Sequence, residues 1–96
     1  MQISIENIQK TFADYYHIKI VELLSKKRTR NLTRPRQIAM AIARDLTIMS
    51  LPEIGNAFVG KDHSTVIHAC KTISTLRASN TTIDADYKIL IQILRG

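Results

Sequence analysis

The sequence predicts a single all-α domain of about six helices across residues 1–96. Two observations carry this prediction: apolar residues recur at helical spacing along most of the chain, and glycine and proline number only three and two. With so few turn-forming residues, the chain has little means of building hairpins between strands. Its 96 residues, 45% of them apolar, suffice for one hydrophobic core and not for two.

Two helices are expected before the middle of the chain. Ser4 is a suitable N-cap, and Ile5, Ile8 and Phe12 follow it at helical spacing. A shorter helix is expected over residues 20–24, where four of the five residues are apolar.

Residues 25–34 have no hydrophobic periodicity and are expected to form an exposed basic loop. Pro35 suits the first turn of a third helix, because its missing amide proton would have no partner there in any case. The buried face of this helix is expected to carry Ile38, Ala41, Ile42, Leu46 and Met49.

A fourth helix is expected over residues 51–58, with Leu51, Ile54 and Phe58 facing inward. Ser50 and Glu53 stand at the spacing of a capping box, in which each side chain bonds the backbone amide of the other residue.

Gly60 then supplies a turn, and Asp62 is a suitable N-cap for a fifth helix. The residues that this helix is expected to bury are Val66, Ile67, Cys70, Ile73 and Leu76. A polar linker at 78–82 and a last helix from about Ile83 complete the fold. The last helix is expected to bury Ile83, Tyr87, Leu90, Ile91 and Leu94.

Residues 51–77 have the organisation of a helix-turn-helix: a short helix, a turn containing glycine and a longer helix. In DNA-binding examples the second helix enters the major groove with its N-terminal residues against base edges. The residues at the corresponding end here are Asp62, His63, Ser64 and Thr65, all of which can make hydrogen bonds to bases. His68 and Lys71 continue the outward face. An ordinary helical hairpin with a solvated polar face would show the same pattern.

The net charge of +6 is concentrated in one part of the chain. Residues 25–77 hold ten Lys or Arg against three acidic residues, whereas the remainder holds four against five. The densest part is residues 25–36, with six bases and no acid: Lys26, Lys27, Arg28, Arg30, Arg34 and Arg36. A localised basic patch beside a polar helix tip indicates phosphate contacts on duplex DNA, with one arginine entering the minor groove. The alternative is a helical protein-interaction module that uses its basic loop on an acidic partner.

Enzymatic activity is not expected. The stretch from Gly55 to Lys61 spells most of a Walker A loop, but the next residue is Asp62 rather than the Ser or Thr that binds Mg²⁺. The histidines and Cys70 lack the paired short spacings of a zinc site. No cofactor or metal is therefore expected. A lone cysteine, with neither a signal peptide nor an apolar run long enough to span a membrane, favours a cytoplasmic location.

One long motif in the chain resembles a known family. Ile54-Gly55-x-x-Phe58-x-Gly60-Lys61-Asp62-His63-Ser64-Thr65-Val66-x-His68-Ala69-Cys70-Lys71-x-Ile73 is similar to the signature IG-x-x-F-x-G-(K/R)-DH-(S/T)-T-V-x-(H/Y)-A. That signature belongs to the C-terminal DNA-binding domain of DnaA, the bacterial chromosomal replication initiator. Arg34-Pro35-Arg36-Gln37 and Ser50-Leu51-Pro52-Glu53 fit the family as well, so the resemblance covers essentially the whole chain.

The resemblance implies a helix-turn-helix of the Trp-repressor type, preceded by a basic loop, that recognises the asymmetric DnaA box of the replication origin. A monomer is expected on such a site, because no pair of exposed apolar stripes in the sequence suggests a dimer face. It implies base contacts from Asp62, His63, Ser64 and Thr65 in the major groove and from Arg28 in the minor groove. With the basic loop and the outward helix face included, the expected backbone contacts are Lys26, Arg30, Arg36, Gln37, Arg44, Thr47, Leu51, Pro52, Lys61, His68 and Lys71.

Two residues show variation that the family also has: Ser64 stands where Thr is common, and Arg44 stands where Lys occurs. The full-length family protein binds ATP through an AAA+ domain, and it carries an N-terminal interaction domain. Neither is present in these residues, so the resemblance implies an isolated C-terminal domain associated with the nucleoid. A contact of the basic loop with acidic phospholipid is a weaker expectation, because no apolar anchoring face accompanies the loop.

Overall fold

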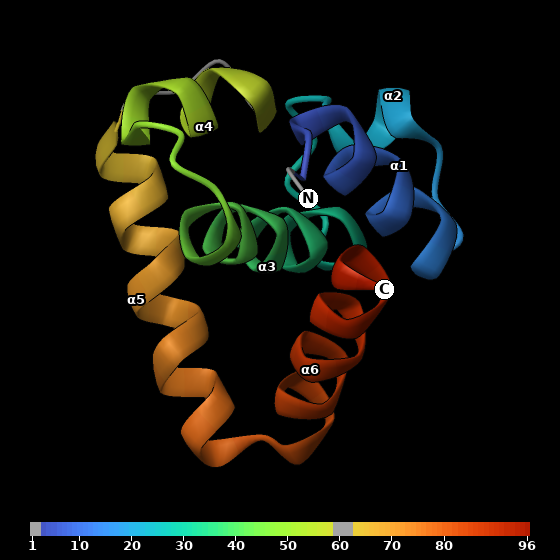
Figure 1. The fold of residues 1–96 in the computed structure, drawn as a ribbon, viewed down its shortest axis with the longest axis vertical. Coiled ribbons are helices and arrows are strands. Elements are labelled where there is room, and N and C mark those ends of the chain that lie inside the picture. The colour runs from blue at the N-terminus through green and yellow to red at the C-terminus, as the bar shows by residue number, and fades with distance from the viewer. Residues whose placement is uncertain (1–2, 59–62) are drawn as a thin grey trace.

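A computed structural model describes residues 3–58 and 63–96 of the chain. These residues form six α-helices and no strand, which confirms the all-α prediction (Figure 1). The helices are α1 (Ile5–Tyr15), α2 (Ile20–Leu23), α3 (Arg30–Leu46), α4 (Leu51–Phe58), α5 (His63–Ser79) and α6 (Thr81–Arg95). None of them is long and apolar enough to cross a membrane.

Helix α3 is the centre of the fold and packs against all five other described helices. In Figure 1 it crosses the middle of the molecule, with α4 and α5 at one end and α1 and α2 at the other. Residues 38–43 are all buried, and six consecutive residues turn through more than one full turn of a helix. This part of α3 is therefore covered on every side. Ala39 and Ala43, both fully buried, let neighbouring helices approach its axis closely.

The start of α3 corrects the predicted basic loop of residues 25–34. The helix begins at Arg30 and contains Pro35 in its interior instead of its first turn. Proline cannot donate to the carbonyl four residues earlier, so one helical hydrogen bond is missing at this point. The extra turn buries Leu32, which is 2% exposed, and the burial of this side chain offsets the missing hydrogen bond. The basic segment between α2 and α3, residues 25–29, is consequently half the predicted length.

Two predicted helix starts are confirmed in atomic detail. The Ser4 side chain accepts a hydrogen bond from the Asn7 amide at 3.1 Å and caps α1. The capping box before α4 is complete: the Glu53 amide donates to Ser50 Oγ at 3.3 Å, and the Ser50 amide donates to Glu53 Oε1 at 3.1 Å. The Glu53 carboxylate accepts the hydrogen bond from the Ser50 amide, and a second interaction with the Ser50 side chain, in its charged form, which lowers its pKa.

The buried stripe of α5 differs from the predicted one, because Ile67 is exposed, Cys70 and Leu76 are only half-buried, and Ala69 is buried. Val66 and Ile73 are buried as expected, with Ala69 between them, but Ile67 is 43% exposed. The stripe follows the i, i+3, i+7 spacing of one helix face, and Ile67 lies a hundred degrees away from Val66. Cys70 is half-buried on this helix, and its burial raises the pKa of the thiol.

The predicted polar linker at 78–82 is wrong. Helix α5 continues to Ser79 and α6 begins at Thr81, so Asn80 alone separates them. Its side-chain oxygen accepts from the amides of Thr82 and Ile83, at 3.0 and 3.1 Å, and caps α6. The polar residues that suggested a linker are instead the last turn of one helix, a cap and the first turn of the next.

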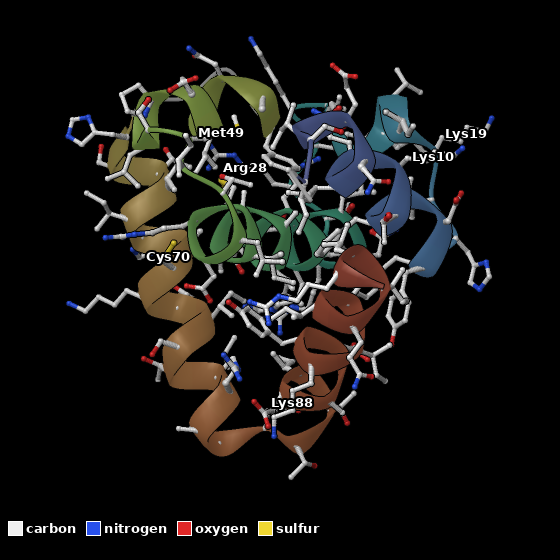
Figure 2. The ribbon with its side chains drawn as sticks, in the orientation of Figure 1. Lys10, Lys19, Arg28, Met49, Cys70 and Lys88 are labelled. Atoms are coloured by element: carbon white, nitrogen blue, oxygen red, sulfur yellow. The ribbon has the colours of Figure 1, made fainter. Side chains whose placement is uncertain are left out.

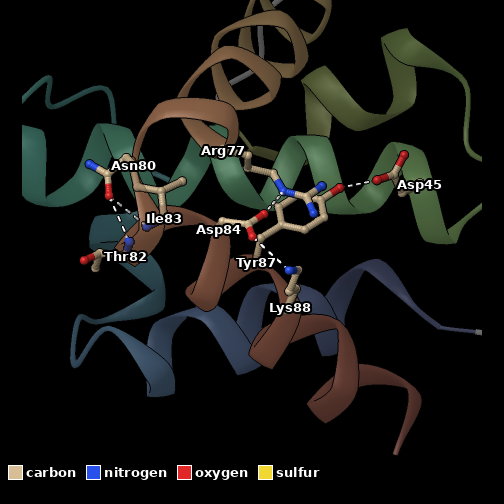
Figure 3. A network of polar contacts seen from close by, with 8 residues as sticks. All are labelled: Asp45, Arg77, Asn80, Thr82, Ile83, Asp84, Tyr87 and Lys88. Carbon is tan, nitrogen blue, oxygen red and sulfur yellow. Dashed lines mark hydrogen bonds and ion pairs between the residues drawn. The ribbon is translucent and has the colours of Figure 1, made fainter.

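A polar network then fixes α6 against α5 and α3 (Figure 3). Arg77 Nε donates to Asp84 Oδ1 at 2.7 Å, and the Arg77 guanidinium lies 3.9 Å from the centre of the Tyr87 ring. The buried Tyr87 hydroxyl donates in turn to Asp45 at the end of α3. Lys88 adds a second ion pair to Asp84 at 3.0 Å. One arginine thus links two helices through a charge pair and an aromatic face.

Replacing Asn80 with Ala should lower the free energy of unfolding by about 1 kcal/mol, because two amides of α6 lose their acceptor. Urea unfolding followed by circular dichroism measures this change. Asn80→Asp is the matched control, since its carboxylate accepts the same bonds and should retain most of the stability. Equal midpoints for wild type and Asn80→Ala would show that the cap does not stabilise this junction.

The Asp84 carboxyl should titrate below the ordinary aspartate pKa, chiefly because of its hydrogen bond to Arg77 and secondly because of its bond to Lys88. A carboxyl group whose pKa is lowered by folding stabilises the folded state at pH values above its unfolded-state pKa. This contribution is lost as the pH falls through the folded-state pKa. A pH titration of carboxyl carbon shifts by NMR measures it. Arg77→Leu should return the Asp84 pKa toward its ordinary value more than Lys88→Leu does. The reverse order would contradict this assignment.

Candidate nucleic-acid interface

A groove of about 760 Å³ brings together the basic segment, the second turn of α3 and the start of α5. We call it the basic groove. Its lining residues are Lys26, Arg28, Thr33, Arg36, Gln37, Met40, Ser64, Thr65, His68 and Ala69. Segments more than thirty residues apart in the sequence therefore share one surface. Six of these residues were predicted as contacts and are exposed or partly exposed: Lys26, Arg28, Gln37, Ser64, Thr65 and His68.

One wall of the groove is the first two turns of α5. Ser64, Thr65 and His68 lie on the same side of the helix, since they stand at i, i+1 and i+4. On the opposite side Val66 and Ile73 hold the helix on the core. His63 is the first residue of α5 and is exposed. The two other residues predicted for this tip, Lys61 and Asp62, lie outside the described residues, as does the predicted turn at Gly60.

The other wall is the basic segment. Lys26 and Arg28 line the groove, and both are exposed. Figure 2 shows three lysines that lie elsewhere: Lys10 and Lys19 are beside α1 and α2, well away from α5, and Lys88 is on α6. The basic groove thus holds a local concentration of positive charge opposite a row of hydroxyl and imidazole groups.

Arg36, which was predicted as a phosphate contact, is buried at the floor of the groove that it helps to line. Only 5% of the residue is exposed, and its guanidinium is engaged within the protein. Nε donates to the Leu23 carbonyl at 2.5 Å, and Nη1 donates to the Lys27 carbonyl at 2.6 Å. A guanidinium bound within the protein in this way has few N–H groups left for a phosphate. Its position in a basic sequence gave no sign of burial.

Residues of α3 complete the groove between the two walls. Arg34 Nη1 donates to Gln37 Oε1 at 2.8 Å, which orients the Gln37 amide. Thr33 was not predicted because residues up to 34 were assigned to a loop, and Met40 was not predicted because it lies outside the expected apolar face of the third helix. The helical spacing of Thr33, Gln37 and Met40 is the signal that would have found them. The Thr33 hydroxyl is buried and has no hydrogen-bond partner among the described residues.

The remaining predicted backbone contacts do not line the basic groove: Arg30, Arg44, Thr47, Leu51, Pro52 and Lys71. Thr47 shapes the turn between α3 and α4, since its hydroxyl donates to the Ala43 carbonyl at 2.6 Å and accepts from the Met49 amide at 3.2 Å. Arg44 lines a second hollow of about 550 Å³ across α5, together with Cys70 and Arg77.

The structure also describes part of the Walker-like stretch and the side chains that could bind a metal ion. The beginning of the Walker-like stretch, residues 55–58, is the end of α4 and follows no strand within the described residues. The described part of the chain contains no cluster of three or more His, Cys, Asp or Glu side chains that would hold a metal ion.

Comparison with known proteins identifies the family. The sequence model of the family described as "Bacterial dnaA protein helix-turn-helix" matches residues 5–73, nearly three quarters of the chain. The chain belongs to this family. Every residue that lines the basic groove lies within the matched span, and so do α4 and the first eleven residues of α5.

Individual relatives agree with this assignment. The chain is 61% identical over 95 residues to the chromosomal replication initiator protein DnaA of Laribacter hongkongensis. It is 63% identical to the DnaA protein of Nitrosomonas eutropha and 59% identical to that of Nitrosospira multiformis, again over 95 residues. Each match covers 99% of this chain and 20–21% of the relative. The chain therefore spans about a fifth of the length of these relatives, and the resemblance to the C-terminal domain of DnaA is confirmed.

Proposed function

We propose that this DnaA domain binds duplex DNA sequence-specifically at DnaA boxes of a replication origin. The basic groove is the observation that carries the proposal. It joins a polar helix end, of the kind that reads bases, to a basic segment, of the kind that binds phosphates. The family match supports the same function, because the matched family is named for its helix-turn-helix and the relatives are named as replication initiators.

In this proposal the start of α5 enters the major groove, which is wide enough to admit an α-helix. Asp62, His63, Ser64 and Thr65 then face base edges. The hydroxyls donate to or accept from bases, the Thr65 methyl packs against a thymine methyl, and the Asp62 carboxylate accepts from a cytosine amine. Helix α4 lies across the DNA backbone and supports α5, as the first helix does in this motif.

The basic segment follows the DNA backbone on the other side of the basic groove. Arg28 enters the minor groove, where the negative potential is strongest and the weak hydration of a guanidinium is favourable. Lys26, Gln37 and His68 contact phosphates from within the groove. The proposed outer contacts are Arg30, Arg44, Thr47, Leu51, Pro52, Lys61 and Lys71. They extend the same surface along the duplex and fix its register.

The domain acts by binding alone and takes no cofactor. A monomer suits the function, because an asymmetric site needs no two-fold partner. ATP-dependent steps of initiation belong to other parts of the longer relatives. A helical module binding an acidic protein through the basic segment would use the same charges, but it would gain nothing from the polar tip of α5.

Thr65→Ala should reduce the preference for a DnaA-box duplex over a base-scrambled duplex by about 1–3 kcal/mol, while leaving weak general binding intact. Fluorescence anisotropy titrations with both duplexes measure this preference. Thr75→Ala is the matched control, since Thr75 is exposed on the same helix outside the basic groove. Equal losses on both duplexes would remove Thr65 from base recognition.

Lys26→Ala should weaken binding to both duplexes alike and reduce the slope of log affinity against log salt by about one, because one phosphate contact releases about one counterion. Lys19→Ala removes the same charge outside the groove lining, beside α2 and away from α5 (Figure 2), and should leave the slope unchanged. If the two variants changed the slope equally, binding would respond to total charge and not to the basic groove.

A further inference from the structure

We propose that Arg36 is a positioning residue that holds Arg28 at the basic groove, through the backbone of the basic segment and without touching DNA. This inference rests on the proposed function. It replaces the direct phosphate contact that the sequence suggested with an internal one. The side chain starts in the second turn of α3 and reaches back to residues 22–27, so it joins the central helix to the segment that precedes it.

The first group of contacts caps α2. Arg36 Nε donates to the Leu23 carbonyl at 2.5 Å, and Nη2 donates to the Glu22 carbonyl at 3.2 Å. The last carbonyls of a helix have no intrahelical partner and form the negative end of its dipole. A buried guanidinium there satisfies two acceptors and is itself stabilised. The short helix α2, only four residues long, is fixed to α3 by this bond.

The second contact acts directly on the segment that carries Arg28. Nη1 donates to the Lys27 carbonyl at 2.6 Å. That carbonyl and the Arg28 amide nitrogen belong to one planar peptide unit. Fixing this carbonyl therefore fixes the plane from which the Arg28 backbone starts. Lys27 itself is exposed and does not line the groove, whereas Lys26 and Arg28 on either side of it do.

Ser25 connects these two groups of contacts. Its hydroxyl donates to the Glu22 carbonyl at 2.7 Å and accepts from Arg36 Nη2 and the Lys27 amide, each at 3.3 Å. Within the described chain, residues 26–28 make no backbone-to-backbone hydrogen bond of their own. The path of the basic segment thus depends on Arg36 and Ser25 instead of a regular ladder.

An arginine is required for this arrangement. Its planar fork spans carbonyls from three different residues, whereas a lysine ammonium is a single point on a flexible stem. Without the fork, the segment would sample other paths, and only a fraction of molecules would present Arg28 in the binding position. The apparent affinity falls in proportion to that fraction. The contribution of Arg28 to binding should therefore depend on Arg36.

A double-mutant cycle tests this dependence. We would measure the affinity of wild type, Arg28→Ala, Arg36→Lys and the double variant for a DnaA-box duplex at one salt concentration. Positioning predicts that Arg28→Ala weakens binding less in the Arg36→Lys background than in wild type, by about threefold or more. The proposal would be overturned if the loss of affinity in the double variant equalled the product of the two single losses to within about twofold.

Arg36→Lys also separates positioning from direct contact with phosphate, because it retains the charge. A direct phosphate contact would survive this change with most of its affinity and an unchanged salt slope. Positioning predicts a loss of affinity together with faster amide hydrogen exchange at Ser25 and Lys27, whose amides are hydrogen-bonded within this network, in the free protein. Retained affinity with unchanged exchange would contradict it.

Ser25→Ala is a second variant in case Arg36→Lys lowers the unfolding midpoint so far that folded protein is scarce. It removes a hydroxyl that bonds Arg36 and Lys27, changes no charge and lies outside the groove lining. We expect the same coupling to Arg28, smaller in size, and strict additivity would again refute positioning.

If wild type itself does not distinguish the box from a scrambled duplex, the proposed function fails and this inference fails with it. If wild type distinguishes them but the cycle is additive, only this inference fails.

Discussion

Because residues 38–43 of α3 are buried on every side, the surrounding helices can be placed only where they cover that helix. Fully buried Ala39 and Ala43 leave no volume for rearrangement, since protein interiors are packed as densely as organic crystals. α5 must lie across α3 with Val66, Ala69 and Ile73 inward. The same constraint turns Ser64, Thr65 and His68 toward the basic segment. The geometry of the basic groove is therefore a consequence of core packing around one helix.

The two ends of α5 are held by different kinds of interaction. Near its start, apolar contacts fix the buried side and leave the polar side facing the groove. Near its end, Arg77 pairs with Asp84 and lies over the Tyr87 ring, whose hydroxyl reaches Asp45 on α3. These polar bonds are directional and anchor the helix at the end remote from the groove. A helix fixed at its far end and along one face can present its first turns at a constant angle, as the proposed recognition of bases would require.

The sequence predicted the helices because their apolar spacing and caps are local properties, as at Ser4 and Ser50. It failed where burial leaves no local signal. Leu32 stands among polar and basic residues, so its burial was not visible in the sequence, and the first turn of α3 was assigned to a loop. The basic groove was predicted in composition, since Arg28, Ser64, Thr65 and His68 were all proposed. The role of Arg36 was not, because no sequence pattern distinguishes a cation that meets carbonyls from one that meets solvent.

The burial of Arg36 also changes how the charge of residues 25–36 should be understood. Six cations in twelve residues repel one another, and an exposed loop of that composition would favour extended, variable paths. Placing one of them among the carbonyls of α2 and Lys27 removes it from the surface and uses its charge to organise the others. Arg34 is similarly engaged with Gln37. The number of phosphates that this segment can neutralise is thus smaller than its count of basic residues. The charges that remain exposed, among them Lys26 and Arg28, are those that a DNA backbone can reach.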